Sequence, residues 1–292
     1  MSSLVDTTWL AGHLDGDDEI GRENVDVVVI EVSSETAGDA DYFTEHIPGS
    51  HFANWKALCW HDTDREFPTP DVMAQRLGAL GVGAEAMIVL VGDPIQYATY
   101  AYWVLAMTGF AENTVLLDGG RAAWLAGGHP TTADIIEPQP AAGQPAPASP
   151  AAHARVDCRV GRDDVRNGLE SPDRVLLDMR SPEEFTGERV SPTFMEVDHG
   201  AQRTGRIPGA RHLYYMQLLT DEGTFKPIDQ MAAEFEEVGA VHEREIVTYC
   251  RLSHRATLGW FVMTELLGYP TVKVYDGSWT EWGSIVGFPI ER

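Results

Sequence analysis

The chain has 292 residues, which at roughly 150 residues per domain is enough for about two domains. Its hydrophobic fraction of 43% supports packed cores and excludes a disordered or fibrous chain. Only 21 Lys and Arg residues face 45 Asp and Glu residues, and the resulting net charge of −24 argues against nucleic acid or an anionic membrane as a partner.

The acidic composition also bears on the surroundings of the protein. Lysine occurs only at Lys56, Lys226 and Lys273, a pattern that favours adaptation to high salt, with a general solubility device as the alternative. The first residues carry no basic, apolar leader, and no apolar run reaches the ~18 residues that span a bilayer. The sequence therefore predicts a soluble, cytoplasmic protein.

The first half alternates expected strands and helices. Val27–Val32 and Met87–Val91 are short, β-branched apolar runs typical of buried parallel strands. A His46-Ile47-Pro48-Gly49 turn lies between them, and a helical pattern follows over Tyr97–Met107. The last motif of this half is Asp118-Gly119-Gly120, which is followed by Trp124.

Five prolines lie among Ala, Gly and Gln between Glu137 and His153, a composition that packs no core and favours extended geometry. We therefore expect a linker at 138–153, with one domain at 1–137 and a second at 154–292.

The second half repeats the first. The expected strands are 174–179 and 245–249, an Arg206-Ile207-Pro208-Gly209-Ala210 turn lies between them, and a helix is expected over 256–267. Asp276-Gly277-Ser278 then lies 158 residues after its counterpart, and Cys250 lies 157 residues after Asp93. Repetition in order at a nearly constant offset indicates duplication. Each half is predicted to be an α/β domain with a mostly parallel sheet and helices on both faces.

Cys250 is the candidate catalytic residue. Ligands of such sheets bind beyond the carboxyl ends of strands, where Asp93 and Cys250 both lie. A loop that runs into a helix N-terminus directs backbone N–H groups at its centre, and Arg251, His254 and Arg255 add positive charge, so the loop favours a nucleophilic thiolate. The alternative is that Cys250 is a small buried hydrophobe.

The other two cysteines, Cys59 and Cys158, are not predicted to be reactive. Three widely separated cysteines without a CxxC pair indicate neither a disulfide framework nor a zinc site. Cys158-Arg159-Val160-Gly161 imitates a reactive loop, but no full apolar strand precedes it and no helical pattern directly follows. Cys59, between Leu58 and Trp60, is interpreted as a packing residue.

Taken together, the two Ile-Pro-Gly turns, the Cys250-Arg251 loop and Tyr275-Asp276-Gly277-Ser278-Trp279-Thr280-Glu281-Trp282 resemble the tandem-domain rhodaneses, which are thiosulfate sulfurtransferases. The resemblance covers nearly the whole chain. It implies a catalytic C-terminal domain and an inactive N-terminal one, in which Asp93 replaces the cysteine.

The resemblance further implies a mechanism. The Cys250 thiolate takes the outer sulfur of thiosulfate, a small anionic donor, and passes it from a persulfide to a thiophilic acceptor such as cyanide or a protein thiol. No metal or organic cofactor is implied. An arginine directly after the cysteine, here Arg251, goes with thiosulfate, whereas a glycine there goes with 3-mercaptopyruvate.

The loop departs from the animal enzymes and is closer to the bacterial CRxGxR type. Leu252 stands in place of a lysine whose charge Arg255 would supply, and Glu184 lies where animal enzymes keep a substrate arginine. Asp178 resembles an acid that orders the site, with a structural cap or ion-pair partner as the alternative. Arg180 is a further candidate substrate residue.

Three other functions compete. A phosphatase of the rhodanese-like type needs a C-x5-R loop, but the position six residues after Cys250 is Ala256. A persulfide carrier without fast thiosulfate turnover would also need Cys250, and mercaptopyruvate sulfurtransferase is the nearest enzymatic variant.

Overall fold

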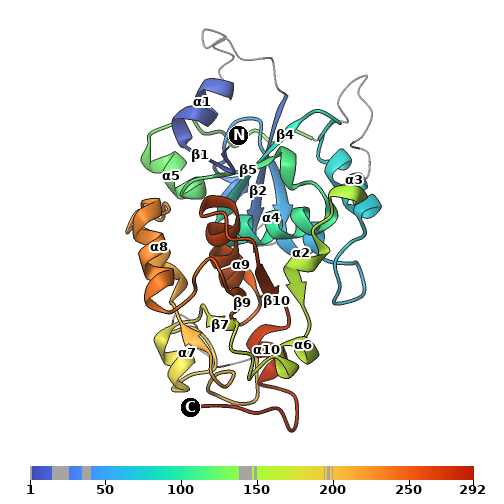
Figure 1. Cartoon of the computed structure of the whole chain (residues 1–292). Coiled ribbons are helices and arrows are strands. Elements are labelled where there is room, and N and C mark those ends of the chain that lie inside the picture. The colour runs from blue at the N-terminus through green and yellow to red at the C-terminus, as the bar shows by residue number, and fades with distance from the viewer. Residues whose placement is uncertain are drawn as a thin grey trace. The chain divides into compact units, whose positions relative to one another are not determined.

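The computed structural model of the protein describes residues 2–14, 26–34, 41–137, 147, 150–193, 195, 198 and 200–292. The chain forms two compact units, one of residues 1–156 with 221–224 and one of residues 157–220 with 225–292 (Figure 1). Most of the predicted linker at 138–153 lies outside the described residues, so the domain bounds drawn from it stay a prediction.

The first unit holds a parallel five-stranded sheet in the order β1-β5-β4-β2-β3. Its strands are β1 (Leu4–Val5), β2 (Val27–Ser33), β3 (His51–Asn54), β4 (Met87–Asp93) and β5 (Thr114–Leu117). The two strands predicted from apolar runs, β2 and β4, pair with each other at the centre, where both faces are covered.

Helices cover both faces of this first sheet. On one face Leu10 of α1 (Thr7–Leu14) and Trp124 of α5 (Gly120–Ala126) pack against Val29, Val89 and Val91 of the central strands. The other face is covered by α4 (Gln96–Thr108), which also contacts α2 (Trp55–Cys59) and α3 (Pro70–Ala79). The predicted helix at 97–107 is thus α4, one residue longer at each end.

The second unit repeats this sheet. Its strands are β6 (Arg159–Val160), β7 (Arg174–Asp178), β8 (Arg211–His212), β9 (Glu245–Tyr249) and β10 (Val272–Tyr275), all parallel, in the order β6-β10-β9-β7-β8. Each strand takes the place of its counterpart in the first unit. The predicted fold class, two tandem α/β domains with parallel sheets, is confirmed.

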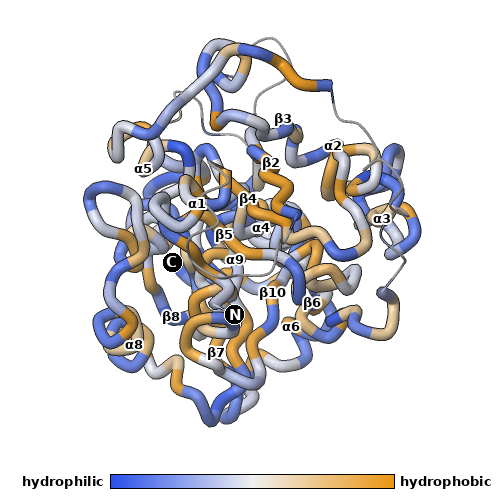
Figure 2. The backbone as a smooth tube through the Cα atoms, turned by 90° about the horizontal axis from the view of Figure 1, so that it is seen from above, coloured by the Kyte–Doolittle hydropathy of each residue, from blue (hydrophilic) through white to orange (hydrophobic). Residues whose placement is uncertain are grey.

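The helices of the second unit also divide between two faces. Val247 and Tyr249 point to one face and form a core with α6 (Arg162–Asn167) and α10 (Ser278–Trp282). The opposite face is covered by α9 (His254–Phe261), which contacts β9 and β10. The unit is completed by α7 (Pro182–Thr186) and α8 (Ile228–Glu237). In Figure 2 the central strands β2 and β4 are hydrophobic segments, whereas the short edge strand β8 (Arg211–His212) is hydrophilic.

The helix expected over 256–267 differs in detail. It begins two residues earlier, at His254, directly after Ser253 in a left-handed conformation. Its last part, Val262–Leu266, is a π-helix rather than an α-helix. Within the described residues, no helix combines the length and the apolar character that a membrane crossing needs.

Candidate functional site

Cys250 lies directly after β9, the central strand of the second sheet, and is 2% exposed. Its backbone is held from both sides by the start of α10. The Cys250 amide donates to Ser278 Oγ at 3.2 Å, and the Cys250 carbonyl accepts from the Trp279 amide at 3.0 Å. The peptide groups on both sides of Cys250 are therefore fixed by hydrogen bonds that do not involve its side chain.

The loop from Cys250 reaches α9 within four residues. The first hydrogen bond of α9 runs from the Thr257 amide to the Ser253 carbonyl at 2.8 Å. The amides of residues 254–256 therefore need acceptors outside the helix. Together with the positive end of the helix dipole, such amides favour an anion. This is the environment that the sequence predicted for a thiolate or an anionic sulfur.

Arg251 is partly buried, and its backbone is anchored as firmly as that of Cys250. Its carbonyl accepts from the Thr280 hydroxyl at 2.8 Å and from the Thr280 amide at 3.2 Å. The guanidinium packs against Met195, with Nη1 3.2 Å from Sδ, and against Gly200. Burial and the neighbouring Arg255 lower the pKa of Arg251. Because the ordinary pKa of arginine lies far above neutrality, Arg251 remains a cation at physiological pH.

Arg255 is a residue that the sequence predicted to add positive charge to the loop. It is buried, and its guanidinium donates to both carboxylate oxygens of Glu184, at 2.6 and 3.0 Å. Burial alone would lower the pKa of Arg255, but the hydrogen bonds to Glu184 and the charges of Cys250 and Glu184 raise it. The positive charge of Arg255 lies near Cys250 and is compensated by the carboxylate of Glu184.

The pairing of Glu184 with Arg255 is what sequence reasoning missed here. Glu184 is fully buried, and it also closes the capping box of α7, where its carboxylate accepts from the Ser181 amide at 3.1 Å. The Ser-Pro-Glu-Glu pattern at 181–184 could have predicted the capping box. Nothing local to it indicates a partner 71 residues away.

Asp178 and Arg180 form a second buried pair, and both are 0% exposed. Arg180 Nη2 lies 2.6 Å from Asp178 Oδ2 and also donates to the Gly205 carbonyl at 2.8 Å. The guanidinium lies over the Trp279 ring, 4.6 Å from its centroid. Each side chain has the other as its partner, so the placement favours the ion-pair alternative for Asp178. His254, the last predicted site residue, is the first residue of α9 and is half-buried.

Tyr215 is a further neighbour of the site. It belongs to the 3-10 turn Tyr215–Leu218, which contacts α9. Burial, the largest cause, raises the pKa of Tyr215 to about 12. The hydroxyl is therefore neutral at physiological pH.

The equivalent position in the first unit is filled by an ion pair. Asp93, at the end of β4, accepts from Arg121 at 2.7 and 3.1 Å. Arg121 is buried and also donates to the Glu45 carbonyl at 2.7 Å. By the offset of 158, Arg121 corresponds to Trp279. At this strand end, one unit carries a carboxylate neutralised by arginine and the other carries a thiol.

The two remaining cysteines are buried. Burial raises the pKa of the Cys59 thiol far above its ordinary value, as expected of a packing residue. Cys158 precedes the two-residue strand β6, and α6 follows at Arg162, so a short helix does stand behind the Cys158-Arg159 motif. Arg159 forms an ion pair with Asp276, its Nη2 lying 3.6 Å from Asp276 Oδ2.

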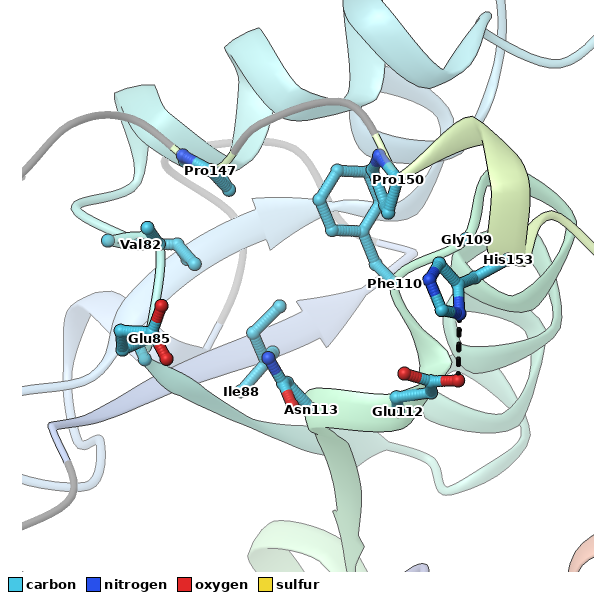
Figure 3. Close-up of a pocket in the computed structure, with 13 residues that line it drawn as sticks. Val82, Glu85, Ile88, Gly109, Phe110, Glu112, Asn113, Pro147, Pro150 and His153 are labelled. Carbon is cyan, nitrogen blue, oxygen red and sulfur yellow. Dashed lines mark hydrogen bonds and ion pairs between the residues drawn. The ribbon is translucent and has the colours of Figure 1, made fainter.

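A cavity of about 260 Å³ in the first unit is a separate feature (Figure 3). It lies at the amino ends of β4 and β5, opposite to the edge where ligands of parallel sheets bind. Glu85 and Glu112 line it, and Glu112 bonds His153 at 2.9 Å. Its carboxylates make it a poor site for an anion.

The fold and the site define a class of protein: a duplicated parallel α/β sheet with one cysteine loop at a central strand end. Comparison with known proteins agrees. Residues 161–285 match the model of the rhodanese-like domain. A Haloferax volcanii protein with the provisional name of thiosulfate sulfurtransferase is 35% identical, over 99% of this chain and 96% of that one.

Two further relatives extend the comparison. The sulfur carrier protein TtuD of Thermus thermophilus is 34% identical, over 99% of this chain and 96% of that one. A variant of EanB that carries a cysteine persulfide, solved with ergothioneine, superposes with a TM-score of 0.79 at 25% identity, over 99% of this chain and 70% of that one. The chain belongs to the rhodanese family.

Proposed function

We propose that the protein is a thiosulfate sulfurtransferase. The observation that carries the proposal is Cys250 at the carboxyl end of β9, in a loop that closes on the start of α9 and presents Arg251. Amides, a helix dipole and a guanidinium gathered at one thiol suit chemistry in which every sulfur species is an anion. The names of the Haloferax and Thermus relatives support sulfur transfer.

The proposed reaction has two steps. The Cys250 thiolate attacks the outer sulfur of thiosulfate, the S–S bond of thiosulfate breaks, and sulfite leaves with the electron pair. The persulfide anion that remains on Cys250 is stabilised by the loop amides. A nucleophilic acceptor, such as cyanide or a thiol, then attacks the terminal sulfur and regenerates the Cys250 thiolate.

Arg251 is proposed to bind the sulfonate of thiosulfate and to set specificity. Arg251→Gly removes charge-assisted hydrogen bonds of about 1.5–3 kcal/mol, so we expect the KM for thiosulfate to rise about 10- to 100-fold. The KM for 3-mercaptopyruvate should change less. In the family that this chain resembles, a glycine directly after the cysteine goes with that substrate. Steady-state kinetics with both donors checks this, and unchanged thiosulfate kinetics would contradict the assigned role.

A persulfide carrier is the second candidate function, and the name of the Thermus relative favours it. A carrier would accept sulfur from a protein partner and would turn over thiosulfate slowly. Purified protein with thiosulfate and cyanide, and no partner, should form thiocyanate over many turnovers. A single turnover followed by arrest would favour the carrier instead.

A phosphatase is disfavoured by the surroundings of the loop. The arginine nearest to the phosphatase spacing is Arg255, and its guanidinium is committed to Glu184. Ala256, at the phosphatase position itself, is buried in α9. An aryl phosphate incubated in parallel with thiosulfate should therefore remain unhydrolysed.

Salt should affect this protein in an unusual direction. The net charge of −24 repels thiosulfate at long range, but the Debye length falls from about 10 Å at 0.1 M salt to about 3 Å at 1 M. The contacts of the loop and Arg251 act at shorter range than that. We expect thiosulfate turnover to persist in ~1 M KCl and to fall on dilution to low salt, with sucrose of equal osmolality as the control. Activity that is lost in high salt and retained in low salt would contradict the high-salt interpretation.

A further inference from the structure

Ser253 has a backbone conformation that serine rarely adopts. Its φ is +74°, in the left-handed region, where a Cβ atom crowds the backbone and glycine is favoured. Within the described part of the chain, Ser278 is the one other non-glycine residue with positive φ, at +52°. Both serines are fully buried. Ser253 lies three residues after Cys250, and Ser278 accepts a hydrogen bond from the Cys250 amide.

The Ser253 hydroxyl has a specific partner. Its Oγ lies 2.6 Å from the Asp276 carbonyl oxygen and 3.0 Å from Asp276 Oδ1. Asp276 is itself buried, and its other carboxylate oxygen faces Arg159 at 3.6 Å. The loop is therefore tied by one side chain to the turn that opens α10.

This tie has consequences for the geometry at Cys250. The Ser253 carbonyl accepts the first hydrogen bond of α9, so the conformation of Ser253 sets where the amides of residues 254–256 point. The same turn holds Cys250 through Ser278, whose Oγ accepts from the Cys250 amide. The hydroxyls of Ser253 and Ser278 thus connect both ends of the loop to residues 276–278.

The first unit offers an internal comparison. By the offset of 158, the counterpart of Ser278 is Gly120, which has φ +58°. A Cβ on Gly120 would lie 2.2 Å from the Gly92 carbonyl oxygen, so that unit needs a glycine there. In the CRxGxR pattern that the Cys250 loop resembles, Ser253 likewise takes the place of a glycine. The second unit accepts a Cβ at both left-handed positions and uses both hydroxyls.

We infer that Ser253 is a positioning residue for Cys250. Its bond to Asp276 holds the loop in a left-handed turn that a side chain would otherwise disfavour, and so keeps the loop amides directed at the sulfur. The inference rests on the proposed function only where sulfur transfer is measured, because the geometry of the loop can be probed without thiosulfate.

Two substitutions separate the hydroxyl from the Cβ atom. Ser253→Ala keeps the Cβ and loses the bond, so the turn should relax and alkylation of Cys250 by iodoacetamide should slow about 10-fold or more. Ser253→Gly loses the bond but also the crowding, so its rate should stay within about 3-fold of the original. Ser284→Ala, which deletes a hydroxyl–carbonyl bond of 2.7 Å in a residue without positive φ, is the matched control and should leave the rate unchanged.

The rate is followed by mass spectrometry of the Cys250 peptide, below the melting transition of each variant, and sulfur loading from thiosulfate is measured beside it. Rescue of the alanine variant's defect by glycine is the expected result. Equal losses in both variants, or no loss in either, would overturn the positioning role. If the original protein loads no sulfur but the alanine–glycine difference in alkylation persists, the proposed function fails and the positioning role stands.

Discussion

Cys250→Ser is expected to lower thiocyanate formation from thiosulfate and cyanide by more than about 1,000-fold, because both proposed steps pass through the Cys250 sulfur. A serine hydroxyl is a far weaker nucleophile near neutral pH and forms no persulfide. The protein should still fold, because the Cys250 backbone bonds to Ser278 and Trp279 do not involve the side chain. Thiocyanate is measured as its iron complex, and the melting temperature is recorded in parallel.

Cys158→Ser is the matched control. Cys158 is also buried and also followed by an arginine, but it precedes a two-residue strand, and Arg159 is committed to Asp276. We expect this variant to retain most of the activity. A large loss in Cys158→Ser together with retained activity in Cys250→Ser would reverse the assignment of the nucleophile.

Glu184→Ala should be the most destabilising of the substitutions considered. It leaves the Arg255 guanidinium buried without its carboxylate partner, and removing one member of a buried pair costs about 3–5 kcal/mol. For a unit of this size the melting temperature should fall by about 10 °C or more. Because Arg255 lies beside Cys250, activity should fall as well, even at temperatures where the variant is folded. Differential scanning calorimetry and the thiocyanate assay check the two effects.

Two further variants make this prediction specific. Glu188→Ala removes an exposed carboxylate on the same segment and should leave the melting temperature unchanged. The double variant Glu184→Leu, Arg255→Met replaces the ion pair by apolar side chains and should recover much of the lost stability, as buried pairs often allow. A single Glu184→Ala variant as stable as the original protein would show that the Arg255 charge has another partner.

Much of the fold could be predicted because its signals are local. The apolar runs of β2 and β9 need no partner to be identified, and the repeat at 157–158 residues indicated two like domains. The bounds of the helix after Cys250 were predicted less accurately. Its start depends on the left-handed Ser253, and that conformation is imposed by Asp276, which is 23 residues away in the sequence.

The candidate site divides in the same way. Cys250, Arg251 and Arg255 could be predicted as candidates because strand, loop and helix follow one another in the sequence. The pairing of Glu184 with Arg255 was not predicted, because it depends on two elements meeting across the unit. The positive charge that the sequence assigned to Arg255 is consequently compensated by Glu184 in the fold. Arg251 packs against Met195, and burial together with Arg255 lowers its pKa.

The central claim, that Cys250 carries the transferred sulfur, is tested most directly by locating that sulfur. The protein is incubated with thiosulfate, separated from it, and digested without reductant for mass spectrometry of the peptides. We expect one added sulfur atom on the Cys250 peptide, lost on treatment with cyanide, present in Cys158→Ser and absent in Cys250→Ser. An added sulfur that persists in Cys250→Ser, or that maps to the Cys158 or Cys59 peptide, would contradict the role of Cys250.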